Sequence, residues 1–516
     1  MIESDYPPTP LVNEPYHEIV LRAIKRQIDT GKNKIAFIKG ERLNEVVTYR
    51  QVYDNAYSIA AFLYSRGFGK DVACAVIPNL WQYSAFFLGV ALRGGAISGA
   101  SAMFTDYELQ RQFVDSGAKV VLTSEEYLEK VLKAVKQSPK VELVIYIPKS
   151  EDHPVPDGVV SWNEVVKARY SSSIPKPNID LDNDIIILPY SSGTTGAPKG
   201  VMLSHRNFAM MIGIYKQHES TNIVPLLSDD WDYEKEKFML FLPFYHVSFL
   251  PLVPPIMVFL AKHPICDEYD LSSIKLLVCG AAPAGKDICE ELSRKYPNMK
   301  YIQQGYGMTE CTMSSHLPDL KNSVPFGSVG KLASNMHMKI VDPSTGKEMP
   351  PGMSGEICIR GPTVMLGYLG KPDATKSTII NGWLHTGTVL FVVLGDIGYV
   401  DEYRNLFIVD RLKELIKVKG LQVAPAELED LLLAHPLIRD AAVIGIPDKR
   451  AGELPRAFVV RASDSLTEED VKLWIKDKVS PHKQLAGGVE FLREIPKSAA
   501  GKILRRVLRE RVSSKL

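Results

Sequence analysis

The chain has 516 residues, of which 45% are hydrophobic and 23% charged, and its formal net charge at pH 7 is +1. This length predicts roughly two to four domains around a large core. The near-zero net charge argues against nucleic acid as the main partner. Six scattered cysteines without a Cys-x-x-Cys pair indicate free thiols in a reducing compartment, rather than a disulfide framework or a zinc site.

The sequence predicts neither a secretory signal nor a membrane span. The N-terminus is acidic and rich in proline, which is unlike a signal peptide. No uninterrupted apolar run approaches the ~20 residues of a membrane span. The longest apolar stretch, Val247–Ala261, contains three prolines and is interpreted as core.

Strand-like and helix-like runs alternate through the first part of the chain. Helices are expected at 17–30, 56–64, 86–93 and 125–135, and strands at 46–48, 72–77, 119–122 and 143–147. Such alternation is typical of βαβ units and predicts an α/β fold with a mostly parallel sheet. The stretch Pro148–Pro177, rich in proline, serine and charge, is expected to be an exposed connection.

The strongest motif is Tyr190-Ser-Ser-Gly-Thr-Thr-Gly-Ala-Pro-Lys-Gly200, which follows a short apolar strand at 185–188. Glycines allow backbone amides to turn toward a ligand, and consecutive amides form an anion-binding nest. The hydroxyl side chains add donors, and the lysine adds a charge suited to phosphate oxygens. A flexible surface loop would not explain the Pro-Lys-Gly end. The motif therefore predicts phosphate binding by Ser191, Ser192, Gly193, Thr194, Thr195, Gly196 and Lys199.

This string matches the signature of the adenylate-forming superfamily, and the chain resembles 4-coumarate–CoA ligases, acyl-CoA synthetases and firefly luciferase from about Tyr49 to its C-terminus. The resemblance implies a large domain over 1–410, built from βαβ units with mixed or parallel sheets. It also implies a small, mobile α+β lid domain over 411–516 with a hinge near Lys413. The implied reaction joins a carboxylic acid to coenzyme A through an acyl-adenylate, using ATP and Mg²⁺.

A second strong motif is Gln303-Gln-Gly-Tyr-Gly-Met-Thr-Glu310. The glycines on either side of Tyr306 allow the backbone to pass close to a planar ligand. Glu310 offers an oxygen ligand for Mg²⁺ and Thr309 offers a hydroxyl for phosphate. A glycine-bulged strand alone would not predict the Thr-Glu pair. The resemblance implies that AMP contacts Gln304, Gly305, Tyr306, Gly307 and Thr309.

Two further segments acquire a role through the resemblance. Gly280-x-x-x-x-Gly285-Lys286 nearly spells a P-loop, but Asp287 replaces the hydroxyl residue that would bind magnesium. The resemblance instead implies a strand-to-helix turn in which Gly280, Ala281 and Ala282 pack against adenine and the acyl chain. His246 ends a Leu-Pro-Phe-Tyr-His run; a lone histidine is usually structural, but the resemblance places it beside the acyl group and the path of the thiol.

The remaining site residues lie toward the C-terminus. A carboxylate and a guanidinium can bind the two hydroxyls of a ribose, and the resemblance gives this role to Asp396 and Arg411. A lysine-rich run usually marks a solvated face, but the resemblance directs Lys417 and Gln422 to the nucleotide or acyl site. It directs Lys419 and Gly420 to coenzyme A. Lys502, in Pro-Lys-Ser-Ala-Ala-Gly-Lys, resembles the mobile lysine of adenylation and is expected to be catalytic together with His246 and Lys199.

The acid itself is not specified by these motifs, and a fatty or other hydrophobic acid is expected. An adenylating enzyme that does not use coenzyme A, as in luciferase, stays open. So do a domain that loads a carrier protein, although no carrier-like segment follows Leu516, and a non-catalytic nucleotide-binding protein. The ending Ser514-Lys515-Leu516 matches the address read by the peroxisomal import receptor and predicts a peroxisomal location, with the cytoplasm as the alternative.

The resemblance is broken at two places. Only six residues separate His246 from Val253, so a unit of about 30 residues or more, with a strand and part of the acyl-pocket wall, is expected to be missing. The family's continuous Trp-Leu-His-Thr-Gly-Asp-Ile-Gly is also split by an apolar insert, residues 388–395. Asp396 can keep its place only if this insert loops out. The two breaks predict a poorly soluble, impaired variant.

Overall fold

The chain folds into two units, each built from segments that lie far apart in the sequence. The first unit comprises residues 1–14 and 203–412, and the second comprises 15–202 and 413–516. The predicted domain boundary at 410/411 stays a prediction, although one unit boundary falls between Leu412 and Lys413. The computed structural model describes residues 1–39, 42–150, 154–171, 173–191, 198–227, 249–252, 254–262, 264–280, 286–322, 324–342, 345–386, 388–389, 392–393, 396–411, 416–419, 421–423, 425–433, 435–496 and 505–513.

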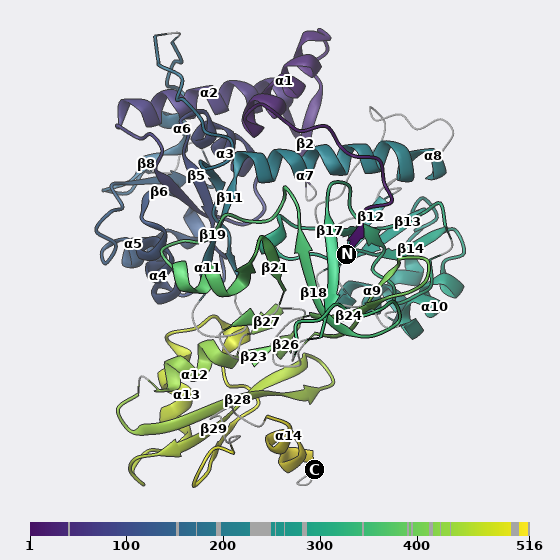
Figure 1. Cartoon of the computed structure of the whole chain (residues 1–516). Helices are drawn as coiled ribbons and strands as arrows, with labels where there is room; N and C mark the ends of the chain where they lie inside the picture. Colours follow the sequence, from purple (N-terminus) through teal and green to yellow (C-terminus); the bar gives the residue numbers. More distant parts are fainter. Residues whose placement is uncertain are drawn as a thin grey trace. The chain divides into compact units, whose positions relative to one another are not determined.

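A largely parallel sheet lies in the N-terminal part of the second unit, with strand order β10-β11-β9-β5-β4-β6-β7-β8. Figure 1 labels β5, β6, β8 and β11 of this sheet. The pairs from β9 through β8 are parallel, whereas β10 and β11 are antiparallel. The α/β prediction is therefore confirmed. The strands are β4 (Val72–Val76), β5 (Ala96–Gly99), β6 (Ala118–Ser124), β7 (Leu143–Ile147), β8 (Val160–Ser161), β9 (Ile185–Ile187), β10 (Tyr190–Ser191) and β11 (Lys199–Ser204).

The predicted N-terminal helices are confirmed, and their ends have local causes. Helix α2 begins at Tyr49 because the Thr48 hydroxyl accepts from the Gln51 amide while the Gln51 side chain caps Thr48 in return. Helix α4 has the same capping box between Thr105 and Glu108. The helices are α1 (Tyr16–Asp29), α2 (Tyr49–Ser65), α3 (Gln82–Leu92), α4 (Asp106–Ser116), α5 (Leu128–Val135) and α6 (Trp162–Val165), beside a hairpin of β2 (Ile35–Lys39) and β3 (Arg42–Thr48).

One N-terminal expectation is wrong in part. The stretch Pro148–Pro177 is more than an exposed connection, because β8 adds an edge strand to the sheet through its parallel pairing with β7. Trp162 and Val165 of α6 are buried. The Ser161 hydroxyl caps α6 by accepting from the Asn163 amide. The proline and charged residues of this stretch predicted a loop, but the stretch contains a short strand and a single helical turn with two buried apolar side chains.

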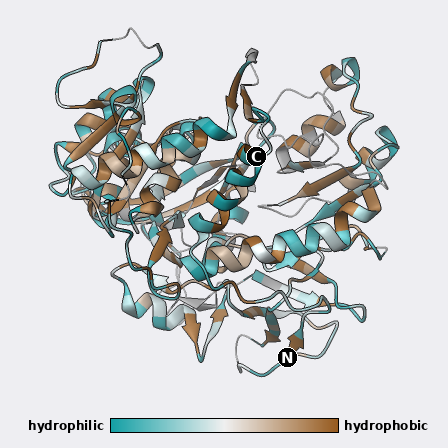
Figure 2. Ribbon diagram, turned by 90° about the horizontal axis from the view of Figure 1, so that it is seen from above, coloured by the Kyte–Doolittle hydropathy of each residue, from teal (hydrophilic) through white to brown (hydrophobic). Residues whose placement is uncertain are grey.

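The first unit contains an antiparallel sheet and a small parallel one. The antiparallel sheet has the order β1-β17-β18-β21-β20, and β24 pairs with both β18 and β25. The parallel sheet β12-β13-β14 lies with α9 and α10 around a core that includes Met257, Leu277 and Leu292. Within the longest apolar stretch, β12 and α9 contribute Leu250, Met257, Leu260 and Ala261 to this core, as expected, whereas Phe259 is exposed. Figure 2 shows strands that are largely hydrophobic and helices that carry both hydrophobic and hydrophilic residues.

The elements of the first unit are β1 (Ile2–Glu3), α7 (His205–His218), α8 (Val224–Leu227), β12 (Phe249–Leu252), α9 (Pro254–Lys262), β13 (Leu276–Cys279), α10 (Lys286–Lys295), β14 (Tyr301–Gln304), β15 (His316–Leu317), β16 (Lys331–Leu332), β17 (His337–Val341), β18 (Gly355–Arg360), β19 (Gly367–Tyr368), α11 (Pro372–Thr378), β20 (Ile379–Ile380), β21 (Trp383–His385), β22 (Thr388–Val389), β23 (Val392–Val393), β24 (Asp396–Val400) and β25 (Leu406–Arg411).

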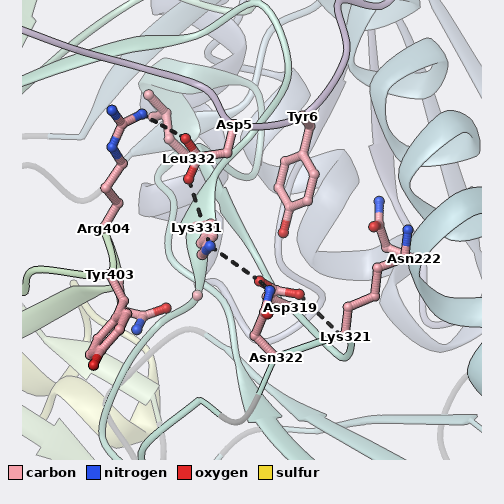
Figure 3. A network of polar contacts seen from close by, with 12 residues as sticks. Asp5, Tyr6, Asn222, Asp319, Lys321, Asn322, Lys331, Leu332, Tyr403 and Arg404 are labelled. Atoms are coloured by element: carbon pink, nitrogen blue, oxygen red, sulfur yellow. Dashed lines mark hydrogen bonds and ion pairs between the residues drawn. The ribbon is translucent and has the colours of Figure 1, made fainter.

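The N-terminal segment is fastened to the first unit by β1 and by a network of charges. β1 pairs with β17. Asp5 accepts a 2.6 Å hydrogen bond from Arg404, and its second oxygen lies 3.6 Å from Lys331 (Figure 3). Lys331 also lies 3.5 Å from the buried Asp319, which accepts from Asn322 at 2.6 Å. These contacts place the N-terminal segment beside the loop before β25.

The C-terminal part of the second unit is a small α+β fold, as predicted. Its sheet has the order β27-β26-β29-β28, with β30 beside β29. Pro425 begins α12, and the Thr467 hydroxyl caps α13 by accepting from the Asp470 amide. The elements are β26 (Ile416–Val418), β27 (Leu421–Val423), α12 (Pro425–Leu433), β28 (Ile438–Asp448), β29 (Gly452–Arg461), α13 (Glu468–Lys476), β30 (Val489–Phe491) and α14 (Arg505–Ser513).

In the second unit, a buried lysine is paired with two buried carboxylates. The Lys483 ammonium lies 2.9 Å from Glu108 and 3.1 Å from Glu427, and all three side chains are buried. Ser480 donates a further hydrogen bond to Glu108. Burial alone lowers the pKa of Lys483, but the two carboxylates raise it, so the ammonium keeps its charge. Helix α4 is thereby joined to the segment after α13.

None of the described helices is long and apolar enough to span a membrane.

Candidate nucleotide and acyl site

The ends of β13 and β14 bring the first group of predicted residues together. The two strands are parallel, with Cys279 opposite Gln304. Gly280 follows β13, and the Gly305 amide donates to the carbonyl of Cys279 at 3.0 Å. The carboxyl ends of parallel strands are where α/β sheets bind ligands. Gly280 and the segment Gly305–Gly307 therefore lie at one edge of this sheet.

Gly307 is required by its surroundings. A Cβ atom at this position would lie 1.8 Å from the carbonyl oxygen of Met313. That close approach arises because the chain turns back through Thr312 and Met313, both in the left-handed region, and pairs Tyr306 with His316. The His316 amide donates to the Tyr306 carbonyl at 3.0 Å. The glycine thus serves a tight backbone crossing, in addition to the ligand approach predicted for it.

Tyr306 joins this segment to the predicted ribose aspartate. The Tyr306 hydroxyl donates a 2.6 Å hydrogen bond to Oδ2 of Asp396. Burial and the Asp396 carboxylate raise the pKa of Tyr306 well above its ordinary value, so the phenol keeps its proton and acts as a donor. Asp396 lies opposite Arg411 in the β24–β25 pair. The predicted ribose pair consists of cross-strand neighbours.

Glu310 fits the predicted role of a magnesium ligand. It lies in the short 3-10 helix Thr309–Cys311 and is buried. Its Oε1 accepts from the Tyr368 hydroxyl at 2.9 Å, and burial and this carboxylate raise the pKa of Tyr368. A carboxylate has two oxygens, and one held by a neutral donor orients the other for a hard cation. Thr309, beside it, carries the hydroxyl expected at the phosphate.

The phosphate-loop motif connects two antiparallel strands of the second unit. Ser191 of β10 lies opposite Lys199 of β11, and Tyr190 lies opposite Gly200. The Ser191 hydroxyl oxygen is buried and finds no hydrogen-bond partner among the described residues. A buried hydroxyl of this kind is suited to receive a ligand. The neighbouring Tyr190 hydroxyl donates a 2.7 Å hydrogen bond to Oδ2 of Asp115.

The lysine-rich run forms a second hairpin of the same unit. Lys417 and Gln422 face each other across β26 and β27. Lys419 occupies the turn with a φ of 50°, and its amide donates to the Ala451 carbonyl. Its exposed side chain is available to a solvent-borne ligand. The structure therefore presents Lys417 and Lys419 on one pair of strands, and their expected ligands stay predictions.

The predicted site residues thus divide into three sets. The first unit holds Gly280, Gln304, Gly305, Tyr306, Gly307, Thr309, Glu310, Asp396 and Arg411. The second unit holds Ser191, Lys199, Lys417, Lys419 and Gln422. Outside the described residues lie Ser192, Gly193, Thr194, Thr195, Gly196, His246, Ala281, Ala282, Lys413, Gly420, Lys502, Ser514, Lys515 and Leu516.

Sequence reasoning missed Tyr368 and His316. Tyr368 holds Glu310 from 58 positions away, and no local motif marks it. His316 is fully buried, and burial lowers its pKa to about 3. Its Nδ1 lies 3.0 Å from the Ser315 hydroxyl. Its ring centre lies 5.8 Å from that of Tyr306. Only the tertiary fold brings Tyr368 and His316 to these site residues.

The insert and the expected gap can be examined in the described residues. Strands β22 and β23, inside the insert, pair with each other and with no other described strand. Asp396 starts β24 and keeps its bond to Tyr306, as expected if the insert loops out. At the other break, β12 pairs only with β13 in the described part of the chain, which leaves β12 at the edge of the small sheet.

The comparisons with known proteins decide the family. The model of the AMP-binding enzyme family matches residues 24–250 and 245–369, and that of the AMP-binding enzyme C-terminal domain matches residues 427–502. The chain belongs to this family of adenylate-forming enzymes. It is an acid–thiol ligase, an enzyme class that uses ATP, Mg²⁺ and coenzyme A. The first match divides at 245–250, where the sequence predicts a missing unit.

Known relatives cover nearly the whole chain. It is 37% identical to 4-coumarate–CoA ligase 1 of Arabidopsis thaliana, over 97% of this chain and 94% of the relative. It is 38% identical to 4-coumarate–CoA ligase 2 of Nicotiana tabacum, over 92% and 90%. The alignment with the Arabidopsis protein spans 541 positions, more than the 516 residues here, so part of that relative faces gaps.

Solved structures support the fold. A double mutant of o-succinylbenzoate CoA synthetase from Bacillus subtilis aligns with a TM-score of 0.75 at 22% identity, over 96% of this chain and 98% of that one. An amide bond synthetase from Marinactinospora thermotolerans also gives 0.75, at 23% identity, over 94% and 99%.

We predict that Tyr306→Phe weakens both the fold and nucleotide binding. The change leaves the half-buried Asp396 carboxylate without its phenol donor, which costs about 1–3 kcal/mol in the free energy of unfolding. ATP affinity should fall about tenfold, because Asp396 loses its orientation. Urea denaturation and calorimetry with ATP measure the two effects. Tyr403→Phe, at an exposed tyrosine of the same unit, is the matched control. Unchanged stability and affinity in Tyr306→Phe would contradict the assignment.

Proposed function

We propose that this chain joins a hydrophobic carboxylic acid to coenzyme A through an acyl-adenylate, with the residues named above forming its site. The observation that carries this proposal is the hydrogen-bonded arrangement of the first unit. There Tyr306 holds the Asp396 carboxylate opposite Arg411, and the buried Glu310 follows four residues after Tyr306. A nucleotide would find a ribose partner in the β24–β25 pair and a metal partner in the 3-10 helix after β14.

In the first step a carboxylate oxygen of the acid attacks the α-phosphorus of ATP, and pyrophosphate leaves. Asp396 and Arg411 would bind the ribose, and Thr309 and the Ser191–Lys199 hairpin would bind phosphate oxygens. Magnesium, held by Glu310, supplies charge neutralisation when it is bound. Like-charged reactants repel each other, so catalysis rests on positioning and on neutralisation by Lys199 and Lys502.

In the second step the thiol of coenzyme A attacks the acyl carbonyl, and AMP leaves. Lys419 and Gly420 would face coenzyme A, and His246 would lie beside the acyl group. Lys502 and Lys419 serve different steps in this assignment, which requires the segment beyond Lys413 to rotate between the steps. No covalent bond to the protein is needed in either step.

For the acid, two lines of support point to hydrophobic compounds of different shape. The relatives named above are 4-coumarate–CoA ligases, which favours aromatic propenoic acids. The C-terminal Ser-Lys-Leu favours a fatty acid, since it predicts a peroxisomal location. ATP–pyrophosphate exchange over aromatic, medium-chain and long-chain acids separates them. Exchange with an acid but no thioester would favour a luciferase-type enzyme, and exchange with none would favour a non-catalytic protein.

The division of labour between the lysines gives a sharp test. Lys502→Ala should slow acyl-adenylate formation by about 100-fold or more, on the order of 3 kcal/mol of transition-state stabilisation. Supplied acyl-adenylate should restore turnover with coenzyme A. Lys472→Ala, at a partly exposed lysine of α13, is the matched control and should change neither step. Equal loss in both half-reactions would show that Lys502 has a different role.

For location, we propose import into peroxisomes through Ser514-Lys515-Leu516. A fluorescent protein fused ahead of the chain, so that Leu516 stays free, should accumulate in peroxisomes. The same fusion with Leu516 deleted should stay diffuse, because the receptor reads the terminal tripeptide. A diffuse signal from the intact fusion would refute the proposal.

We also propose that the two breaks impair this chain. A version without residues 388–395, and with a strand–helix–strand unit restored after His246, should be more soluble and more active. The insert adds apolar side chains, and the gap leaves β12 as an edge strand in the described structure. Melting temperature and pyrophosphate exchange are compared for the chain as it stands, each single repair and both repairs. Equal stability and turnover in all four would show that the breaks are harmless.

A further inference from the structure

A cluster of three potential metal ligands lies on one face of the antiparallel sheet of the first unit. Glu356 and Cys358 are two positions apart on β18, so their side chains share a face. His385 of β21 lies directly opposite Cys358 in the strand pairing. In the part of the chain that the structure describes, this is the only group of three or more His, Cys, Asp or Glu side chains close enough to share one ion.

The distances fit a tetrahedral site. The sulfur of Cys358 lies 3.4 Å from Nδ1 of His385, and that nitrogen lies 3.0 Å from Oε2 of Glu356. With metal bonds of 2.0–2.3 Å, ligands on a tetrahedral zinc stand about 3.3–3.8 Å apart. All three donor atoms lie within 4.8 Å of one another. Small shifts of the side chains would close them around an ion.

The cluster lies in largely buried surroundings. Cys358 and Glu356 are buried, and the His385 side chain is 16% exposed, which leaves one side for entry. Val341 and Trp383 pack with Cys358 and give the cluster an apolar shell. The neighbouring Lys339 lies over the Trp383 ring, with its ammonium 4.8 Å from the ring centre. Its charge is therefore partly stabilised by the ring beside the cluster.

We propose that Glu356, Cys358 and His385 form a binding site for a borderline-soft divalent cation, with zinc as the best match. Sulfur, nitrogen and oxygen donors together are the set that zinc accepts, whereas magnesium and calcium prefer oxygen alone. Three protein ligands leave the fourth position for water. The site is separate from Glu310, the magnesium ligand of the proposed function. It departs from the sequence expectation of no zinc site, because the ligands come from two strands and not from a Cys-x-x-Cys motif.

In the absence of an ion the same groups form a hydrogen-bonded chain. The ring nitrogen of His385 can carry the proton that Glu356 accepts, and the Cys358 sulfur lies against the same nitrogen. An incoming cation must displace the thiol proton and the imidazole proton at Nδ1. Binding therefore releases protons, as metal binding to thiol and imidazole groups does.

Cobalt(II) titration of the whole, metal-free chain tests the proposal, since cobalt occupies zinc sites and reports sulfur ligation by a charge-transfer band. The expected result is one cobalt per chain with this band, displaced by one equivalent of zinc. Cys358→Ser should lose the band, and His385→Gln should lower the affinity at least about tenfold. Cys74→Ser is the matched control, because Cys74 is equally buried and has only serine-type partners near its sulfur.

Two further measurements keep the test decisive. Circular dichroism confirms that each variant is folded; if Cys358→Ser is not, Glu356→Gln and His385→Gln replace it, and both should weaken cobalt binding. Zinc should raise the melting temperature of the wild type and of Cys74→Ser only. Absence of the band in the wild type, or its persistence in folded Cys358→Ser, would overturn the proposal. Neither readout depends on ligase activity.

Discussion

The hydrogen bond from Tyr306 to Asp396 holds together the part of the first unit on which the candidate site depends. It joins residues 90 positions apart and links the end of the small parallel sheet to the start of β24. Tyr306 can take this position only because Gly307 allows the chain to cross beneath Met313. The glycine at position 307 therefore determines where the Tyr306 phenol lies, and that phenol positions the Asp396 carboxylate expected at the ribose.

The same bond explains how an eight-residue apolar insert leaves the site recognisable. The insert precedes Asp396 directly, yet β22 and β23 pair only with each other among the described strands. β24 still pairs with β18, with Glu356 opposite Ile397, and with β25, with Asp396 opposite Arg411. The register of β24 is therefore kept despite the insert, and a loss of solubility stays a prediction. Because the register of β24 is kept, removal of the insert is expected to change solubility more than the geometry of the site.

Local chemistry was predictable from the sequence. Thr467 and Asp470 supply a complete capping box within four residues, and Pro425 starts a helix because its ring presets φ and its missing amide is not needed there. The strand Leu143–Ile147 is a continuous apolar run with parallel neighbours on both sides. In each of these cases, the sequence pattern and the structure that it specifies lie within the same few residues.

Pairings between distant segments could not be predicted in this way. No local motif near Glu310 predicts its hydrogen bond with Tyr368. No local motif near Lys483 predicts its contact with Glu108, 375 positions away. Buried charges need partners, so each implies that a partner exists, but the identity of the partner follows from the fold. The placement of Lys502 and His246, outside the described residues, rests on their motifs alone.

Strand β18 takes part in both the proposed cation cluster and the sheet that contains Asp396. One end pairs with β24, which begins with Asp396, and its middle carries Cys358 opposite His385 of β21. An ion bound by Glu356, Cys358 and His385 would tie β18 to β21. Glu356 itself lies opposite Ile397, the residue after Asp396. Because β18 and β24 are paired in one sheet, the proposed cation and the carboxylate predicted to bind the ribose would share one support.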